Sequence, residues 1–171
     1  MLISKPMNAA LNAQVGHEFG ASLQYVQIAT YFDREGLPTL ARHFYKQSDE
    51  ERDHAMKFVR FIADAAGQVE IPAIPAPQST FNSAEEAVRK SVDWEVSVTK
   101  QINALMDLAI KDNDHITRNF LNWFMEEQLE EVSSMETLLS MVRRAGESGL
   151  LFVESYLAGR KGGAGEAGHE S

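Results

Sequence analysis

The stretch Glu50-Glu51-Arg52-Asp53-His54 places two ionisable side chains on the apolar face of a long helix predicted between Pro38 and Gly67. Steps of four and three residues give the core stripe of this helix as Leu40, Phe44, Gln47, Glu51, His54, Phe58 and Phe61. Residues three apart lie about 60° apart around a helix, so the Glu51 carboxylate and the His54 imidazole can converge on one point. A buried carboxylate needs a partner, and an oxygen and nitrogen ligand pair suits a divalent transition metal. Because Glu-x-x-His is also common on polar surfaces, the other helices must supply further ligands.

The composition fits one domain in a reducing compartment. The 171 residues can bury a substantial core, and the absence of cysteine excludes disulfides, thiolate zinc sites and cysteine-ligated iron–sulfur clusters. No apolar run is long enough to span a bilayer and the first residues lack a secretion signal, so we expect a cytoplasmic protein with no membrane partner. A net charge of −9 argues against nucleic acid as a partner and suits a surface that attracts cations.

Four long segments show helical periodicity without strand-like alternation, which predicts an all-α fold. We expect helices at about 4–34, 38–67, 83–112 and from 115 to 146 or 149. A short apolar segment at 150–158 should dock on the bundle or on another subunit. The turn with Gly36 and Pro38 makes the first two helices antiparallel neighbours. Residues 1–158 are expected to form the domain and the glycine-rich residues 159–171 a flexible tail.

The connection at residues 67–83 is expected to contain no helix, because it includes Pro72, Pro75 and Pro77. Fully extended, it can reach roughly 55 Å, more than the roughly 45 Å length of a 30-residue helix. It can therefore return along the whole bundle and join two antiparallel helix pairs by one long crossover. The alternative is a flexible linker between two hairpins, against which the chain offers three apolar residues able to pack, Val69, Ile71 and Ile74.

Polar residues interrupt the core stripes of all four helices near their middles: Glu18, Glu51, His54, Glu95, Gln128 and Glu131. Four carboxylates that converge in a dry bundle repel one another unless cations neutralise them, and they balance two divalent ions. Carboxylates with one nitrogen donor suit iron or manganese better than magnesium. Di-iron carboxylate bundles use a Glu from each of two helices and Glu-x-x-His from each of the other two. Here the fourth helix offers Gln128 and Glu131, so the second histidine is missing.

The chain resembles the non-haem bacterial ferritins from residue 1 to about 158, with matching residues in chain order at Glu18, Tyr25, Glu51-x-x-His54, Glu95 and Gln128-x-x-Glu131. The resemblance implies a ferritin-like four-helix bundle with one crossover between helices 2 and 3 and a short fifth C-terminal helix. Haem-carrying bacterioferritin would be expected to have a second Glu-x-x-His on the fourth helix and a methionine after the second-helix glutamate. Glu131 and Arg52 occupy those places, so we expect no haem.

The resemblance further implies an iron-storing ferroxidase. Glu18, Glu51 and His54 would bind the first iron, and Glu51 would bridge to a second iron. Glu95 and Glu131 would hold that second iron, with Gln128 close by. Dioxygen or hydrogen peroxide would oxidise the ferrous iron, and ferric mineral would collect in a hollow homo-oligomeric shell of twenty-four subunits. Members of the family are also similar in a third iron position, which would use Glu50, Glu127, Glu130 and Glu131. An exposed glutamate cluster is otherwise an ordinary solvated face.

Tyr25 follows Glu18 by seven residues, so its hydroxyl can reach the metal ligands to orient one of them or to donate an electron. It could equally be a buried tyrosine with a single hydrogen-bond partner. Two other functions stay open. A metal-free structural or interaction bundle would require the six intruding polar residues to form a closed hydrogen-bond network. A peroxide-scavenging di-iron enzyme resembling rubrerythrin would lack the cysteines of that family's electron-transfer domain.

Overall fold

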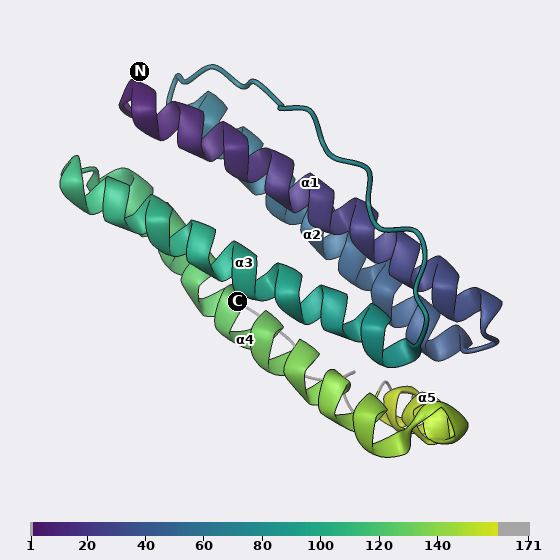
Figure 1. Ribbon diagram of the computed structural model, residues 1–171. Coiled ribbons are helices and arrows are strands. Elements are labelled where there is room, and N and C mark those ends of the chain that lie inside the picture. The colour runs from purple at the N-terminus through teal and green to yellow at the C-terminus, as the bar shows by residue number, and fades with distance from the viewer. Residues whose placement is uncertain (1, 161–171) are drawn as a thin grey trace, which may run out of the picture.

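The computed structural model describes residues 2–160, and within this range the chain is all-α. Figure 1 shows four long helices, α1 (Lys5–Arg34), α2 (Pro38–Asp64), α3 (Ala84–Lys111) and α4 (His115–Ala145), followed by a 3₁₀ turn (Glu147–Gly149) and the short helix α5 (Leu150–Arg160). The predicted four-helix bundle with a short C-terminal helix is confirmed. None of the described helices combines the length and the apolar character needed to cross a membrane.

Side-chain caps fix the starts of α1, α3 and α4, at Ser4, Ser83 and Asp114. The Ser83 hydroxyl accepts a hydrogen bond from the Glu86 N–H at 3.1 Å, and the Glu86 carboxylate accepts one from the N–H of Asn82. Gly36 takes the left-handed conformation, with φ of 72°, in the turn between α1 and α2. The end of α2 differs from the prediction, because the helix stops at Asp64 and Ala66, not Gly67, adopts the positive φ.

The connection between α2 and α3 runs along α1 for the length of the bundle, as the teal trace in Figure 1 shows. Two buried amides of α1 hold its backbone. Asn12 donates to the Gln68 carbonyl at 2.8 Å and accepts from the Glu70 N–H at 2.7 Å, and Gln24 makes the same pair of bonds to Gln78 at 2.9 Å each. The crossover is therefore bound to the bundle, although Ile71, which we expected to pack, is 56% exposed.

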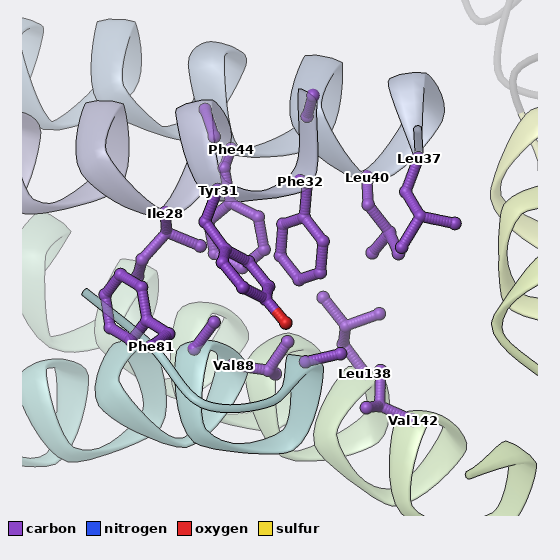
Figure 2. Packing of buried hydrophobic residues seen from close by; sticks show 14 of the residues in the cluster. Ile28, Tyr31, Phe32, Leu37, Leu40, Phe44, Phe81, Val88, Leu138 and Val142 are labelled. Carbon is purple, nitrogen blue, oxygen red and sulfur yellow. The ribbon is translucent and has the colours of Figure 1, made fainter. Parts of the chain in front are cut away.

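Two apolar clusters fill the bundle on either side of its polar middle. One lies toward α5 and includes Ile28, Phe32, Phe44, Val88 and Leu138, with the rings of Phe32 and Phe44 stacked at 5.6 Å (Figure 2). The other lies toward the opposite end and includes Leu11, Val15, Phe58, Ile102 and Phe124. The intruding polar residues are thus enclosed by apolar layers that exclude water, which strengthens every electrostatic interaction between them.

The short helix α5 docks on its own chain. Its Glu154 carboxylate accepts hydrogen bonds from the N–H groups of Thr39 and Leu40 at 2.9 and 2.6 Å, at a helix start that has no side-chain cap of its own. Leu150 and Val153 are buried beside it. The helix continues to Arg160, two residues beyond the predicted domain end at 158, and residues 161–171 of the predicted tail lie outside the described range.

Candidate metal site

Glu18, Glu51 and His54 form the tightest group of potential metal ligands in the described chain. One donor atom from each lies within 4.8 Å of the others, and the side chains are only 1 to 4% exposed. The antiparallel packing of α1 on α2 brings Glu18 to the level of the Glu51-x-x-His54 pair. Three such donors, close together and dry, can contact one cation.

Glu51 has an unused acceptor inside this group. The Nδ1 atom of His54 lies 3.2 Å from Oε2 of Glu51, within hydrogen-bond distance. The other oxygen, Oε1, is buried and has no hydrogen-bond partner in the structure. A buried carboxylate oxygen without a donor is unfavourable, so this atom is a position that a metal ion would satisfy.

Glu95 of α3 and Glu131 of α4 supply the other half of the constellation, at 1% and 6% exposure. The Tyr25 hydroxyl donates a short hydrogen bond to Oε1 of Glu95, and the Gln128 amide donates to Oε2 at 3.2 Å. The same Gln128 nitrogen lies 3.2 Å from the Thr99 hydroxyl oxygen. Tyr25 and Gln128 therefore orient Glu95 through hydrogen bonds, and the amide nitrogen of Gln128 points to this carboxylate.

The surroundings of all four carboxyl groups favour the protonated, uncharged form. Burial raises the pKa of Glu18 and Glu51 well above the ordinary value, and the charges of Glu51 and Glu95, respectively, raise these pKa values further. Burial also raises the pKa of Glu95, and burial together with the charge of Glu95 raises the pKa of Glu131 to about 8. The protein interior therefore disfavours the carboxylate anions. Bound divalent cations would instead favour the anions and lower these pKa values.

The residues predicted for a third metal position lie at the edge of this group and differ in their surroundings. Glu50 is half-buried and bound by the Gln47 amide at 2.5 Å and by Lys46 at 3.1 Å. Glu127 lies 3.9 Å from Nε2 of His54, and Glu130 is exposed. The charges of Glu50 and Glu127 contribute to the raised pKa of Glu131, so both act on the site electrostatically without belonging to its tight cluster.

Sequence reasoning missed Gln14, which is 2% exposed and donates a hydrogen bond from Nε2 to Oε1 of Glu18 at 2.8 Å. Gln14 lies one helical turn before Glu18, and residues four apart share a helix face, so the spacing could have indicated a contact between them. A polar residue at that offset is nevertheless common on helices, and only the packing shows that this amide is buried.

Aromatic rings close one side of the site. The ring of His54 meets Trp123 and Phe124 of α4 edge to face, at centroid distances of 5.4 and 5.9 Å. The Lys57 ammonium lies 3.8 Å from the centre of the Trp123 ring. These contacts fix the plane of the imidazole and keep water from its apolar faces.

Comparisons with known proteins agree with this geometry. Residues 8–145 match the family model of the ferritin-like domain. Ferritin BfrB of Mycolicibacterium smegmatis is 41% identical over 158 residues, which cover 92% of this chain and 87% of the relative. The bacterial non-heme ferritin of Staphylococcus aureus is 36% identical, covering 93% and 97% of the two chains. The open pore ferritin of Archaeoglobus fulgidus superposes with a TM-score of 0.88 at 35% identity, over 91% of this chain and 96% of that one.

Proposed function

Because the chain belongs to the ferritin family, we propose that it stores iron by oxidising ferrous ions at the buried carboxylate site and collecting the ferric product inside an assembly of its own copies. The observation that carries the proposal is the group of Glu18, Glu51 and His54, in which Glu51 Oε1 is buried without a partner. Iron is the substrate and the cargo in this scheme, and the protein supplies the ligands.

The ligand roles follow from the two halves of the site. Glu18, Glu51 and His54 would hold one ferrous ion, and Glu51 would share its second oxygen with a neighbouring ion. Glu95 and Glu131 would hold that neighbour. Two divalent ions carry four positive charges and so neutralise the four carboxylates, which the apolar layers otherwise disfavour as anions. Binding would therefore displace the protons that the raised pKa values retain.

The oxidation needs only the ions and an oxidant. Two ferrous ions give one electron each to dioxygen, which takes up two protons and leaves as hydrogen peroxide. With peroxide as the oxidant, two electrons and two protons give two water molecules. Glu18 and Glu51 would bind both ions and keep them adjacent, and the hydrogen bonds from Tyr25 and Gln128 would hold Glu95 in a fixed orientation toward them.

The outer acidic residues have a supporting part in the proposal. Glu50, Glu127 and Glu130, together with Glu131, would bind a third ion on its way to or from the pair, because they combine charge with partial exposure. Tyr25 could also give an electron, since its hydroxyl bonds directly to Glu95. The absence of haem and a cytoplasmic location stay predictions from the sequence.

The test is anaerobic loading with ferrous iron followed by admission of air, with ferric absorbance recorded for the wild type, Glu51→Ala and Glu136→Ala. Glu136 is an exposed carboxylate of α4 and serves as the matched control. The wild type and the control should show a rapid phase that consumes about two irons per chain, and Glu51→Ala should lose it. A wild type no faster than Glu51→Ala or buffer would overturn the assignment.

The metal-free structural bundle is disfavoured because its hydrogen-bond network is not closed at Glu51 Oε1. The two functions also differ in the stability of the metal-free protein. A structural network predicts that Glu51→Gln unfolds at a lower temperature than the wild type. A metal site predicts an equal or higher unfolding temperature, because the substitution removes one of several mutually repelling carboxyl groups. Thermal unfolding in the presence of a chelator distinguishes the two.

A further inference from the structure

Gln14 is buried beside the site and belongs to none of the ligand positions assigned above. Its side chain is 2% exposed, and its Nε2 donates to Oε1 of Glu18 at 2.8 Å. No other side-chain hydrogen bond to Glu18 favours the charged form of this carboxyl group. Gln14 is therefore the partner that fixes how Glu18 is presented to the centre.

The nitrogen and the oxygen of the Gln14 amide each have a neighbouring side chain. Its NH₂ end faces Glu18, which in the ionised, metal-binding form can only accept. The carbonyl end, Oε1, lies 3.4 Å from Nδ1 of His17, and an amide oxygen requires that this nitrogen donate. A reversed amide would face oxygen to oxygen at Glu18. The amide thus contacts Glu18 inside the bundle with its NH₂ end and His17 at the surface with its carbonyl end.

His17 makes this contact from outside the bundle. The residue is exposed, and its ring lines a surface groove of about 310 Å³ between α1 and α3, together with Asp93 and Trp94. The chain of contacts from this groove through Gln14 to Glu18 links the outer surface to the first metal position by two hydrogen bonds.

The two carboxylates at the opposite ends of the site are held differently. Both oxygens of Glu95 accept hydrogen bonds, from Tyr25 and Gln128. Gln14 occupies only Oε1 of Glu18. Because the amide donor competes with a metal ion for that oxygen, it directs an ion to Oε2 and disfavours binding through both oxygens at once.

Resting on the proposed function, we infer that Gln14 is a positioning residue that commits Glu18 to bind the first metal ion through a single oxygen. One-oxygen binding leaves a further coordination position at that ion open to the oxidant or to the shared oxygen of Glu51. Without the amide, Glu18 would be free to rotate or to bind through both oxygens, and the ion would be held in a different geometry.

The test uses Co²⁺, which reports its coordination in visible absorbance and does not undergo the oxidation reaction. Gln14→Met keeps the length and burial of the side chain but removes the donor. Gln24→Met is the matched control, because Gln24 is an equally buried glutamine of α1 that binds the crossover at Gln78 instead of a ligand. Metal-free unfolding temperatures are measured for both variants, so that a loss of stability is separated from a change at the site.

We expect Gln14→Met to change the shape of the visible Co²⁺ band and to shift the Co²⁺ affinity by roughly 10- to 100-fold, whereas Gln24→Met keeps the wild-type affinity and spectrum. An unchanged affinity and spectrum in folded Gln14→Met would overturn the positioning role and leave the metal site intact. A wild type that binds no Co²⁺, or binds it equally well as Glu51→Gln, would instead refute the proposed function.

His17→Phe decides the question if Gln14→Met does not fold. The change is at an exposed position, and it removes the donor that holds the Gln14 carbonyl. A spectral change in the same direction as expected for Gln14→Met, smaller in size, would support the role. A wild-type spectrum in His17→Phe would then overturn it.

Discussion

At the scale of single residues, the buried Glu131 carboxyl group makes the stability of the fold depend on pH. Its side chain is 6% exposed, and burial together with the charges of Glu95 and Glu50 raises its pKa to about 8. In the unfolded chain the same carboxyl group titrates near the ordinary value of 4.5. Between these two pH values the folded, metal-free protein keeps a proton that the unfolded chain releases, so folding becomes less favourable as the pH rises.

We therefore expect the metal-free protein to lose stability from about pH 5 to pH 8, by up to about 1.4 kcal/mol per pH unit for each such group. Glu131→Gln should reduce this slope because glutamine does not titrate. Urea unfolding at several pH values, in the presence of a chelator, measures the effect. Glu136→Gln, at an exposed position, should keep the wild-type slope, and equal slopes in all three proteins would contradict the linkage.

Single hydrogen bonds also show which polar residues of the site bond to one another. Tyr25 and Gln128 both donate to Glu95, and Gln14 donates to Glu18. The stripe pattern alone treats Gln128 and Glu131 alike, because both interrupt the same apolar face. The difference between them is that the Gln128 amide carries protons to donate, whereas the Glu131 carboxylate can bind a cation.

At the scale of elements, the crossover and α5 hold the ends of the bundle together. The crossover packs along α1, where Gly16 leaves room for Pro72, and a Cβ at Gly16 would lie 2.4 Å from Cγ of Pro72. Helix α5 closes the other end through Glu154, which binds the first N–H groups of α2. The first contact holds α1, which carries Glu18, and the second holds the start of α2, which carries Glu51 and His54.

Gly16→Ala should destabilise the protein by about 1–3 kcal/mol, because the added methyl group forces Pro72 and its backbone away from α1. Gly159→Ala is the matched control: this glycine lies in α5, and a Cβ there meets nothing within 4 Å. Alanine at position 159 should leave stability unchanged or raise it by up to about 1 kcal/mol. Thermal unfolding of both variants measures the difference, and equal midpoints would show that the crossover adapts without loss.

At the scale of the whole molecule, the outer face of α5 carries Phe152, the most exposed large apolar side chain among the described residues. Leu151 is 70% and Phe152 81% exposed, and Tyr156 is 47% exposed on the same short helix. Residues 150 and 153 bury the inner face of α5, and among the described residues the side chains of Leu151 and Phe152 stay largely uncovered. Since the solved relatives are ferritins, contact between copies of the chain is the expected use of this face.

We predict that Phe152→Asp prevents full assembly, because a charge would be buried between copies without a partner. Sedimentation velocity should show a large oligomer for the wild type and smaller species for the variant. Phe152→Leu, which stays apolar, should assemble normally. Circular dichroism should be unchanged in both variants, and a fully assembled Phe152→Asp would exclude this face from the subunit contacts.

The sequence by itself determined the helices and the candidate ligands. Its stripes placed Glu18, Glu51, His54, Glu95, Gln128 and Glu131 in the core, and all six are buried. This was possible because helical periodicity fixes which residues face inward, and a polar residue at such a position needs a partner. The two tight turns and the prolines of the crossover also fixed the topology.

Only the tertiary structure decided how these groups are held. Distances between helices cannot be read from periodicity, so the tight group of Glu18, Glu51 and His54, the unpartnered Glu51 oxygen and the donors to Glu95 became visible only after packing. The capping of α2 by Glu154 and the amide of Gln14 were missed for the same reason. A hydrogen bond requires two groups within about 3 Å in the right orientation, and that is set by the packing of whole helices, not by local sequence.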